Sequence, residues 1–128
     1  MTPWTQAELA KVGGAEELEI ESRRADGTLR KPVTIWVVRV DDDVYVRAVN
    51  GRESGWFRGV LTRHEGRVAA GGVAKPVTLV ETPDAELNDR IDAAYRAKYR
   101  RYAASIIDSV NSPKARAATL RLVPGSSN

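Results

Sequence analysis

The sequence predicts an α+β fold: a small antiparallel β-barrel of about six strands, a short N-terminal helix, a short helix after the central hairpin and one long helix before the last strand. Short apolar segments recur between turn residues, as in antiparallel sheets. Residues 84–102 carry apolar side chains at helical spacing, and a strand-like segment follows them, which favours a barrel. Because neither a linker nor an internal repeat is visible, we expect residues 1–128 to form a single domain.

Composition excludes several classes of protein and site. The 128 residues are 42% hydrophobic and 29% charged, which is neither a disordered nor a membrane composition. Without a signal peptide or an apolar run near the roughly 20 residues that a membrane helix needs, we expect a cytoplasmic protein. The absence of cysteine excludes disulfides and thiolate chemistry, and the single histidine, His64, excludes multi-histidine metal sites.

The charge is distributed unevenly. Residues 1–22 carry five glutamates and one lysine, whereas the rest of the chain has an excess of basic residues, most of them arginine. Guanidinium groups suit the recognition of phosphates and carboxylates. An arginine-rich chain is equally what a GC-rich genome tends to encode, so composition alone leaves both interpretations open.

The chain begins with a predicted helix and a predicted strand. Thr5 and Glu8 have the spacing of a capping box, which predicts a helix over residues 5–12 that two glycines end. Strict alternation of acidic and apolar residues over residues 17–22 predicts a half-exposed strand. An Asp-Gly pair at residues 26–27 then predicts a turn.

A long hairpin is the clearest element. The strand expected over residues 31–40 is apolar on both faces, so one face should pack on the core and the other should meet a helix or a partner chain. Residues 41–43 are three aspartates, which we interpret as an exposed turn because the spacing, glycine and distal glutamate of a calcium loop are missing. Residues 44–49 form the returning strand.

The segment after the hairpin is a candidate anion site. Ser54 could cap a short helix whose free amides would point outward, close to Arg52 and Arg58. The alternative is an ordinary capped connection whose arginines face water.

The second half should contain two strands, the long helix and a last strand. We expect the strands over residues 67–72 and 74–81, and Thr82 as the cap of the long helix. The apolar stripe of that helix should face the core and its basic side should face solvent. Residues 105–113 look irregular or partly helical, and residues 115–123 should form the last strand.

Several pieces of the sequence resemble known families. Residues 20–58 resemble the flavin- and deazaflavin-binding split β-barrels, a pyridoxamine-phosphate-oxidase-like group, and within it the deazaflavin-dependent nitroreductase branch. Nearly the whole chain resembles the DUF2255 proteins. The pieces that carry the second resemblance are Ser-Arg-Arg-Ala-Asp-Gly-Thr at 22–28, Ile-Trp-Val-Val-Arg at 35–39, Ser-Gly-Trp-Phe-Arg at 54–58 and Asp-Ala-Ala-Tyr-Arg-Ala-Lys-Tyr at 92–99.

The resemblance implies a fold, a cofactor and a set of binding residues. It implies a homodimer that holds FMN or the deazaflavin F420 near the subunit interface, with Trp36 or Trp56 beside the ring. The remaining cofactor-binding residues that it implies are Arg23, Arg24, Thr28, Lys31, Ser54 and Arg58. Hydride chemistry would come from the cofactor, so no catalytic side chain is expected. The segment at residues 51–56 is more compact than in the deazaflavin enzymes, which puts the cofactor pocket in doubt.

Two functions follow as hypotheses. The first is an FMN- or F420-binding protein, with the reduction of a small organic substrate as its candidate activity. The alternative is a non-enzymatic small-ligand-binding protein or a degenerate flavin fold. We do not expect nucleic acid or a membrane as a partner. The net charge of +3 is low for nucleic-acid binding, and the tyrosines lie on the apolar stripe of the long helix rather than on its basic face.

Overall fold

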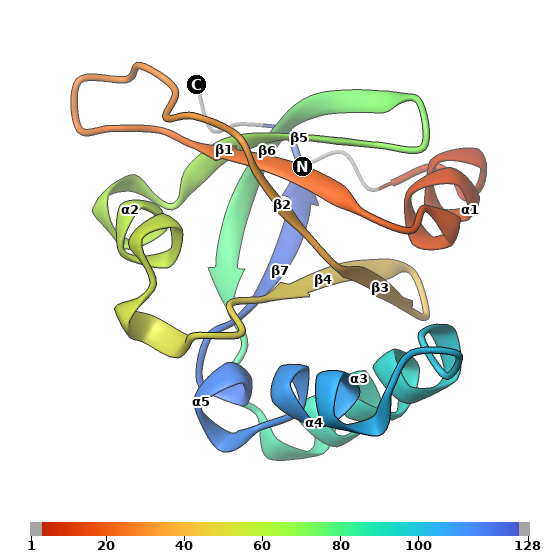
Figure 1. The fold of residues 1–128 in the computed structure, drawn as a ribbon. Helices are drawn as coiled ribbons and strands as arrows, with labels where there is room; N and C mark the ends of the chain where they lie inside the picture. The colour runs from red at the N-terminus through yellow and green to blue at the C-terminus, as the bar shows by residue number, and fades with distance from the viewer. Residues whose placement is uncertain (1–3, 126–128) are drawn as a thin grey trace.

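The computed structural model describes residues 4–125 and contains a nearly closed antiparallel β-barrel with helices around it (Figure 1). Its seven strands are β1 Leu18–Ser22, β2 Val33–Ile35, β3 Val37–Val40, β4 Asp43–Arg47, β5 Glu65–Ala70, β6 Val73–Glu81 and β7 Thr119–Pro124. Its helices are α1 Gln6–Gly14, the 3-10 turn η1 Gly51–Glu53, α2 Gly55–Arg63, α3 Ala85–Lys98, α4 Ala104–Val110 and α5 Pro113–Arg116. The predicted fold class is confirmed.

The barrel closes through a single bent segment. The strand order is β2-β1-β5-β6-β7-β4-β3, so β2 and β3 lie at opposite ends of the sheet although only Trp36 separates them in sequence. β2 pairs with β1, and β3 pairs with β4. The single strand predicted over residues 31–40 is therefore wrong. The chain leaves one sheet edge at Trp36 and joins the other, which is why the barrel has seven strands.

The two apolar faces of this segment contact different clusters, as predicted. Val33, Ile35 and Val37 contact the barrel interior, together with the buried residues of β1, β5, β6 and β7. Trp36, Val38 and Val40 contact a second cluster outside the barrel, whose centre is the tyrosine stripe of α3. The apolar pattern allowed either a helix or a partner chain on the outer face, and in the structure helix α3 packs there. The two-faced pattern therefore gives no support to a partner chain on this face.

The structure differs from the sequence prediction at the ends of two helices. The capping box of Thr5 and Glu8 is present, and α1 continues through both glycines. The cap of α3 is Asp84, whose side chain accepts a hydrogen bond from the amide of Leu87, so the expected cap at Thr82 is wrong. Thr82 instead donates to the backbone oxygen of Thr119 and ties the start of the helix to β7.

The basic side of α3 faces solvent, as predicted, except at Lys98. Lys98 is half-buried and donates to the Val37 carbonyl at 2.5 Å. Arg90 is exposed and pairs with Asp41, and Arg100, beyond the end of the helix, is also exposed. Residues 104–116 form two short helices, so β7 begins later than predicted. No helix among residues 4–125 has the length and apolar character needed to cross a membrane.

Candidate ligand-binding site

A cavity of about 370 Å³ lies between β2, the start of α2 and α4. Trp36 and Trp56 line it, together with Val33, Val49 and Ile106. Val49 and Ile106 are 42% and 47% exposed and are the exposed large apolar side chains among the described residues. We call this space the tryptophan cavity. Its size and apolar lining are those of a small-ligand site.

A basic cleft adjoins the tryptophan cavity. Val33 and Trp56 line both spaces, and beyond them lie two connected hollows of about 370 and 400 Å³ that share Arg30 and Gly55. The cations that line these hollows are Arg24, Arg30, Lys31 and Arg58, and no carboxylate lines them. Among the described residues, Arg30, Lys31 and Arg58 form no ion pair with a carboxylate. Three of the four cations of the cleft are therefore without a carboxylate partner in the described part of the chain, while Arg24 interacts electrostatically with Asp26.

Arg30 lies across helix α2 at Gly59. A Cβ atom at Gly59 would lie 2.6 Å from Arg30 Nε, so this crossing requires glycine. Arg30 Nε is buried and has no hydrogen-bond partner among the described residues. Its backbone amide donates to the Ser22 carbonyl, which anchors the residue beside β1. Arg30 is thus held in the centre of the cleft by backbone contacts.

The start of α2 opens onto the same cleft. Ser54 occupies the N-cap position, as predicted, but its hydroxyl donates to the Gly51 carbonyl at 3.0 Å and does not cap the helix amides. Gly55, the first helical residue, lines both parts of the cleft and has open space around its Cα. The first amides of a helix have no partner within the helix, and the helix dipole adds partial positive charge there. Cations and free amides together form an arrangement suited to an anion.

The residues implied by the family resemblance fall into three groups. Trp36, Ser54 and Trp56 line the tryptophan cavity. Arg24, Lys31 and Arg58 line the basic cleft. Arg23 and Thr28 line neither of these spaces and instead hold the hairpin turn: Arg23 Nη1 donates to the Gly27 carbonyl at 2.7 Å, and Thr28 Oγ1 donates to Asp26 at 2.7 Å.

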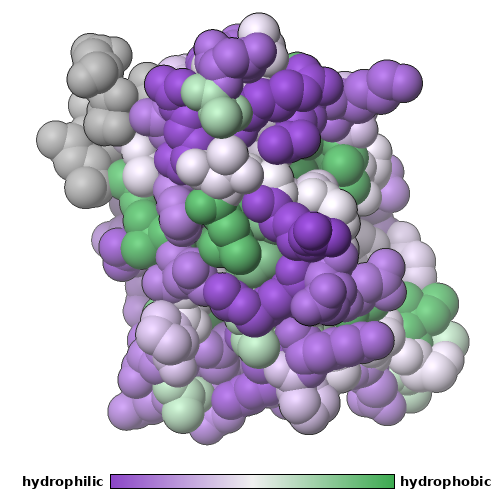
Figure 2. Space-filling model, turned by 90° about the vertical axis from the view of Figure 1, so that its left-hand side faces the viewer, coloured by the Kyte–Doolittle hydropathy of each residue, from purple (hydrophilic) through white to green (hydrophobic). Residues whose placement is uncertain are grey.

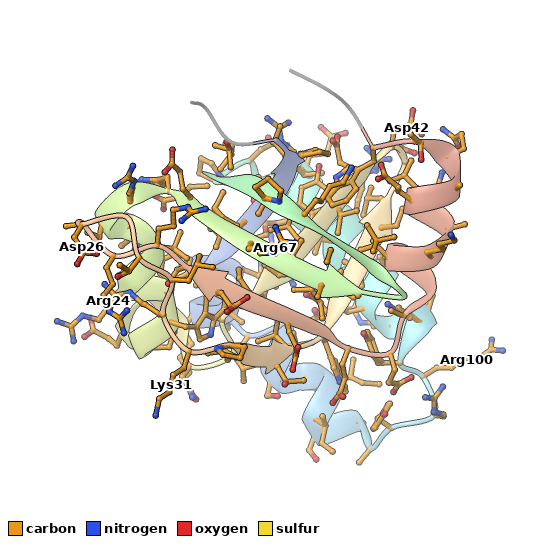
Figure 3. All side chains as sticks on the ribbon, turned by 90° about the horizontal axis from the view of Figure 1, so that it is seen from above. Arg24, Asp26, Lys31, Asp42, Arg67 and Arg100 are labelled. Atoms are coloured by element: carbon orange, nitrogen blue, oxygen red, sulfur yellow. The ribbon has the colours of Figure 1, made fainter. Side chains whose placement is uncertain are left out.

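The figures show where these residues lie. In Figure 3, Arg24 and Lys31 lie on the side of the molecule that carries α2, whereas Arg100 lies at the other end. Figure 2 shows the face that carries α2 and the 24–29 hairpin, where hydrophilic residues surround small, separate apolar patches.

Trp36 is not free on both ring faces. Its ring stacks on Tyr99 with centroids 3.8 Å apart and an interplanar angle of 3°, and Tyr102 lies 4.9 Å away at a tilt. One face is therefore occupied by the outer aromatic cluster. Trp56 contacts Phe57 edge-on at 6.0 Å and borders both the cavity and the cleft.

The sequence analysis missed Arg30 and Arg47. Arg47 borders the tryptophan cavity and has a fully buried side chain, which donates to Asp92 at 2.6 Å, to Asn88 at 2.8 Å and to Thr119 at 2.9 Å. Burial lowers the pKa of Arg47, and the hydrogen bond with Asp92 opposes this effect. An arginine between apolar strand residues was a visible signal for a buried polar network, whereas the position of Arg30 depends on the tertiary fold.

Comparison with solved structures supports the fold. The chain is similar to HutZ, the heme storage protein from Vibrio cholerae (TM-score 0.64, 13% identity, 88% of this chain and 84% of that one). It is also similar to an F420-H2 dependent reductase (TM-score 0.60, 17% identity, 84% and 93%) and to an FAD-binding protein from Mesorhizobium loti (TM-score 0.60, 14% identity, 98% and 93%). These proteins share the split β-barrel fold with this chain.

Sequence comparison gives the family. No curated protein matches the sequence. Residues 8–122 match the family described as "Uncharacterized protein conserved in bacteria (DUF2255)". Because this match covers most of the chain, the protein belongs to the DUF2255 family.

Proposed function

We propose that the protein binds a flavin-type cofactor, FMN or F420, with the ring system in the tryptophan cavity and the phosphate in the basic cleft. The observation that carries this proposal is the group of four cations at the open N-terminus of α2, which no lining carboxylate neutralises. Trp56 borders both spaces, so a ligand with an aromatic ring and an anionic tail could occupy both at once.

The residues present fit such a ligand. Arg30, Lys31 and Arg58 provide charged donors for a phosphate, and the amides at Gly55 add uncharged ones. The apolar wall of Val33, Ile35 and Trp56 would exclude water from one side of the ring. When bound, the cofactor itself supplies hydride transfer, which is consistent with a cavity without cysteine or histidine. An oxidoreductase that reduces a small organic substrate is the activity that this chemistry supports.

Heme is a less suitable ligand for this cavity. Histidine is a common protein ligand of heme iron, and the one histidine of the sequence is His64. His64 lies at the C-terminal end of α2, 3.9 Å from Glu81, and lines neither the tryptophan cavity nor the basic cleft. We therefore do not propose heme storage, the role in the name of HutZ, for this chain.

We further propose that a second copy of the chain covers the mouth of the tryptophan cavity. Val49 and Ile106, the two large exposed apolar side chains among the described residues, both line this cavity. Apolar side chains that gather at one opening are typical of an interaction surface. Ile106→Asp should convert a dimer into a monomer in sedimentation velocity, whereas Arg100→Asp should not.

The cofactor proposal is tested by native purification, a visible absorption spectrum and titration with FMN and with F420. We expect binding at micromolar or lower concentration. A colourless protein that binds neither ligand at these concentrations would contradict the proposal. Binding without turnover of any nitroaromatic or quinone substrate would instead leave a ligand-binding protein without enzyme activity.

A further inference from the structure

Three aromatic rings connect the wall of the tryptophan cavity to the outside of the protein. Trp36 lines the cavity and stacks on Tyr99, with ring centroids 3.8 Å apart. The ring of Tyr102 lies 4.9 Å from that of Trp36, beyond the end of α3, and is half-buried. An electron that moves from the surface to the cavity wall therefore passes between aromatic rings that are in contact.

The two tyrosines that contact Trp36 differ in their proton acceptors. The Tyr102 hydroxyl donates to the carboxylate of Glu16, which Arg101 also contacts. The Tyr99 hydroxyl donates to the backbone oxygen of Glu16 at 2.7 Å and also lies 3.2 Å from the Val37 carbonyl. A carboxylate can accept a proton readily at neutral pH, whereas a backbone carbonyl cannot.

We propose that Trp36 and Tyr102 form a one-electron relay between the tryptophan cavity and the protein surface. A one-electron oxidant in the cavity takes an electron from Trp36, an electron moves from Tyr102 to Trp36, and the phenolic proton of Tyr102 passes to Glu16. The oxidant gains one electron, Trp36 returns to its starting state, Tyr102 becomes a neutral radical and Glu16 becomes protonated.

A photoexcited flavin in the cavity is one oxidant that meets this requirement, and in that respect the relay rests on the proposed function. The intramolecular step does not depend on a bound cofactor, because all three participating side chains belong to this chain. It can therefore be tested on the protein alone.

The geometry explains why the relay ends at Tyr102 rather than at the closer Tyr99. A phenol gives up an electron readily only when its proton leaves at the same time. The hydroxyl of the buried Tyr99 donates to backbone oxygens, which offer no base for its proton. The Tyr102 hydroxyl donates directly to the Glu16 carboxylate, which can take the phenolic proton along this hydrogen bond; the hydrogen bonds with Tyr102 and Arg101 lower the pKa of Glu16, so it is ionised at neutral pH.

The position of Tyr102 gives the relay a use. Because Tyr102 is half-buried at the outer side of the cluster, a small reductant in solution can restore it without entering the cavity. A cofactor ring beside Trp36 could then receive single electrons from a reductant that stays outside the cavity.

Pulse radiolysis in azide solution tests this step. Azide radicals oxidise tryptophan in preference to tyrosine at neutral pH, and the later conversion of a tryptophan radical into a tyrosyl radical is followed by absorption. In the wild-type protein we expect a first-order conversion whose rate does not depend on protein concentration. Trp36→Phe and Tyr102→Phe should each abolish most of it, and Glu16→Gln should slow it about tenfold or more.

Matched variants separate the relay from a merely structural role. Trp56→Phe removes the other cavity tryptophan, and Tyr99→Phe removes the phenol while keeping the stacked ring, so both should retain the conversion. Tyr45→Phe, in the same apolar cluster, should also retain it. Circular dichroism would check that every variant is folded. Conversion at the wild-type rate in Trp36→Phe or Tyr102→Phe would overturn the proposal, whether or not the protein binds a flavin.

Discussion

Two arginine-lined regions of the molecule differ in whether their arginines are paired with carboxylates. A cavity of about 560 Å³, larger than the tryptophan cavity, is lined by Arg52, Glu81 and Arg116. Arg52 pairs with Glu81 at 2.5 Å, and Arg116 pairs with Asp89 at 3.0 Å. We call this space the paired cavity. In the basic cleft, by contrast, no carboxylate lines the walls.

This difference shows that charge pairing identifies the candidate site better than volume does. The arginines of the paired cavity already have carboxylate partners, so an incoming anion would have to compete with them. The cations of the basic cleft form no ion pair with a carboxylate of the described residues, so they can contact a phosphate without breaking one. We therefore expect substitutions in the paired network to change stability and substitutions in the basic cleft to change binding.

The largest expected effect concerns Arg47, whose partners Asn88 and Thr119 also line the paired cavity. Arg47→Met should lower the free energy of unfolding by about 3–5 kcal/mol, because one oxygen of Asp92 and the buried carbonyl oxygens of Asn88 and Val110 lose their charged donor, although Arg116 still pairs with Asp92. Urea unfolding followed by circular dichroism measures this. Arg58→Met, at an exposed cleft residue, should stay within about 0.5 kcal/mol of the wild type. A loss below about 1 kcal/mol in Arg47→Met would contradict the structural role.

The second-largest expected effect is a loss of affinity for FMN in the basic cleft. Arg30→Met should weaken FMN binding about 10- to 100-fold, because a charge-assisted hydrogen bond is worth about 1.5–3 kcal/mol. Arg52→Met, in the paired cavity, is the control and should leave the affinity unchanged. Fluorescence titration of FMN gives both values. Equal losses in the two variants would show that the distinction between paired and unpaired arginines is wrong.

Gly59→Ala tests the same site without removing a charge. The new Cβ would lie 2.6 Å from Arg30 Nε and 3.0 Å from Ser22 Oγ, so the flexible Arg30 side chain must move. Alanine favours a helix over glycine by about 1 kcal/mol, which should offset the crowding in the free energy of unfolding. We expect FMN affinity to fall about tenfold with little change in stability. Gly14→Ala, where the Cβ would contact nothing within 4 Å, should leave the affinity unaltered.

The smallest effect concerns Lys98, which is half-buried with a backbone carbonyl as its hydrogen-bond partner. Burial lowers its pKa to about 8 from an ordinary value of 10.5. Between these two values the unfolded chain binds more protons than the folded one, so the stability rises with pH across this window. The wild type should gain about 1 kcal/mol or less over Lys98→Met between pH 7.5 and 9.5, since partial exposure screens the charge. A parallel pH dependence in both proteins would contradict this account.

Local patterns were sufficient to predict most of the fold. The alternation at Leu18 and Ile20, the capping box of Thr5 and Glu8 and the tyrosine stripe of α3 each depend on near neighbours, and all three are confirmed. The bend at Trp36 was not predicted, because a strand that leaves one sheet edge for another keeps the same apolar pattern on both sides of the bend.

Only part of the candidate site could be predicted from the sequence, for a similar reason. Lys31, Ser54, Trp56 and Arg58 could be named from a resemblance, but the role of Arg30 follows from its crossing of α2 at Gly59, 29 positions later in the chain. Arg52 and Arg58 look alike in the sequence, and only the fold brings Glu81 beside Arg52. Whether a surface arginine is paired depends on distant residues that no local pattern reveals.

The most direct test of the central claim compares FMN with riboflavin, which has the same ring but lacks the phosphate. If the basic cleft holds the phosphate, the wild-type protein should bind FMN at least about tenfold more tightly than riboflavin. This preference should disappear in the double variant Arg30→Met and Lys31→Met, in which the affinity for riboflavin should stay the same. Equal affinity of the wild-type protein for FMN and riboflavin, or no binding of either, would contradict the assignment of the basic cleft as a phosphate site.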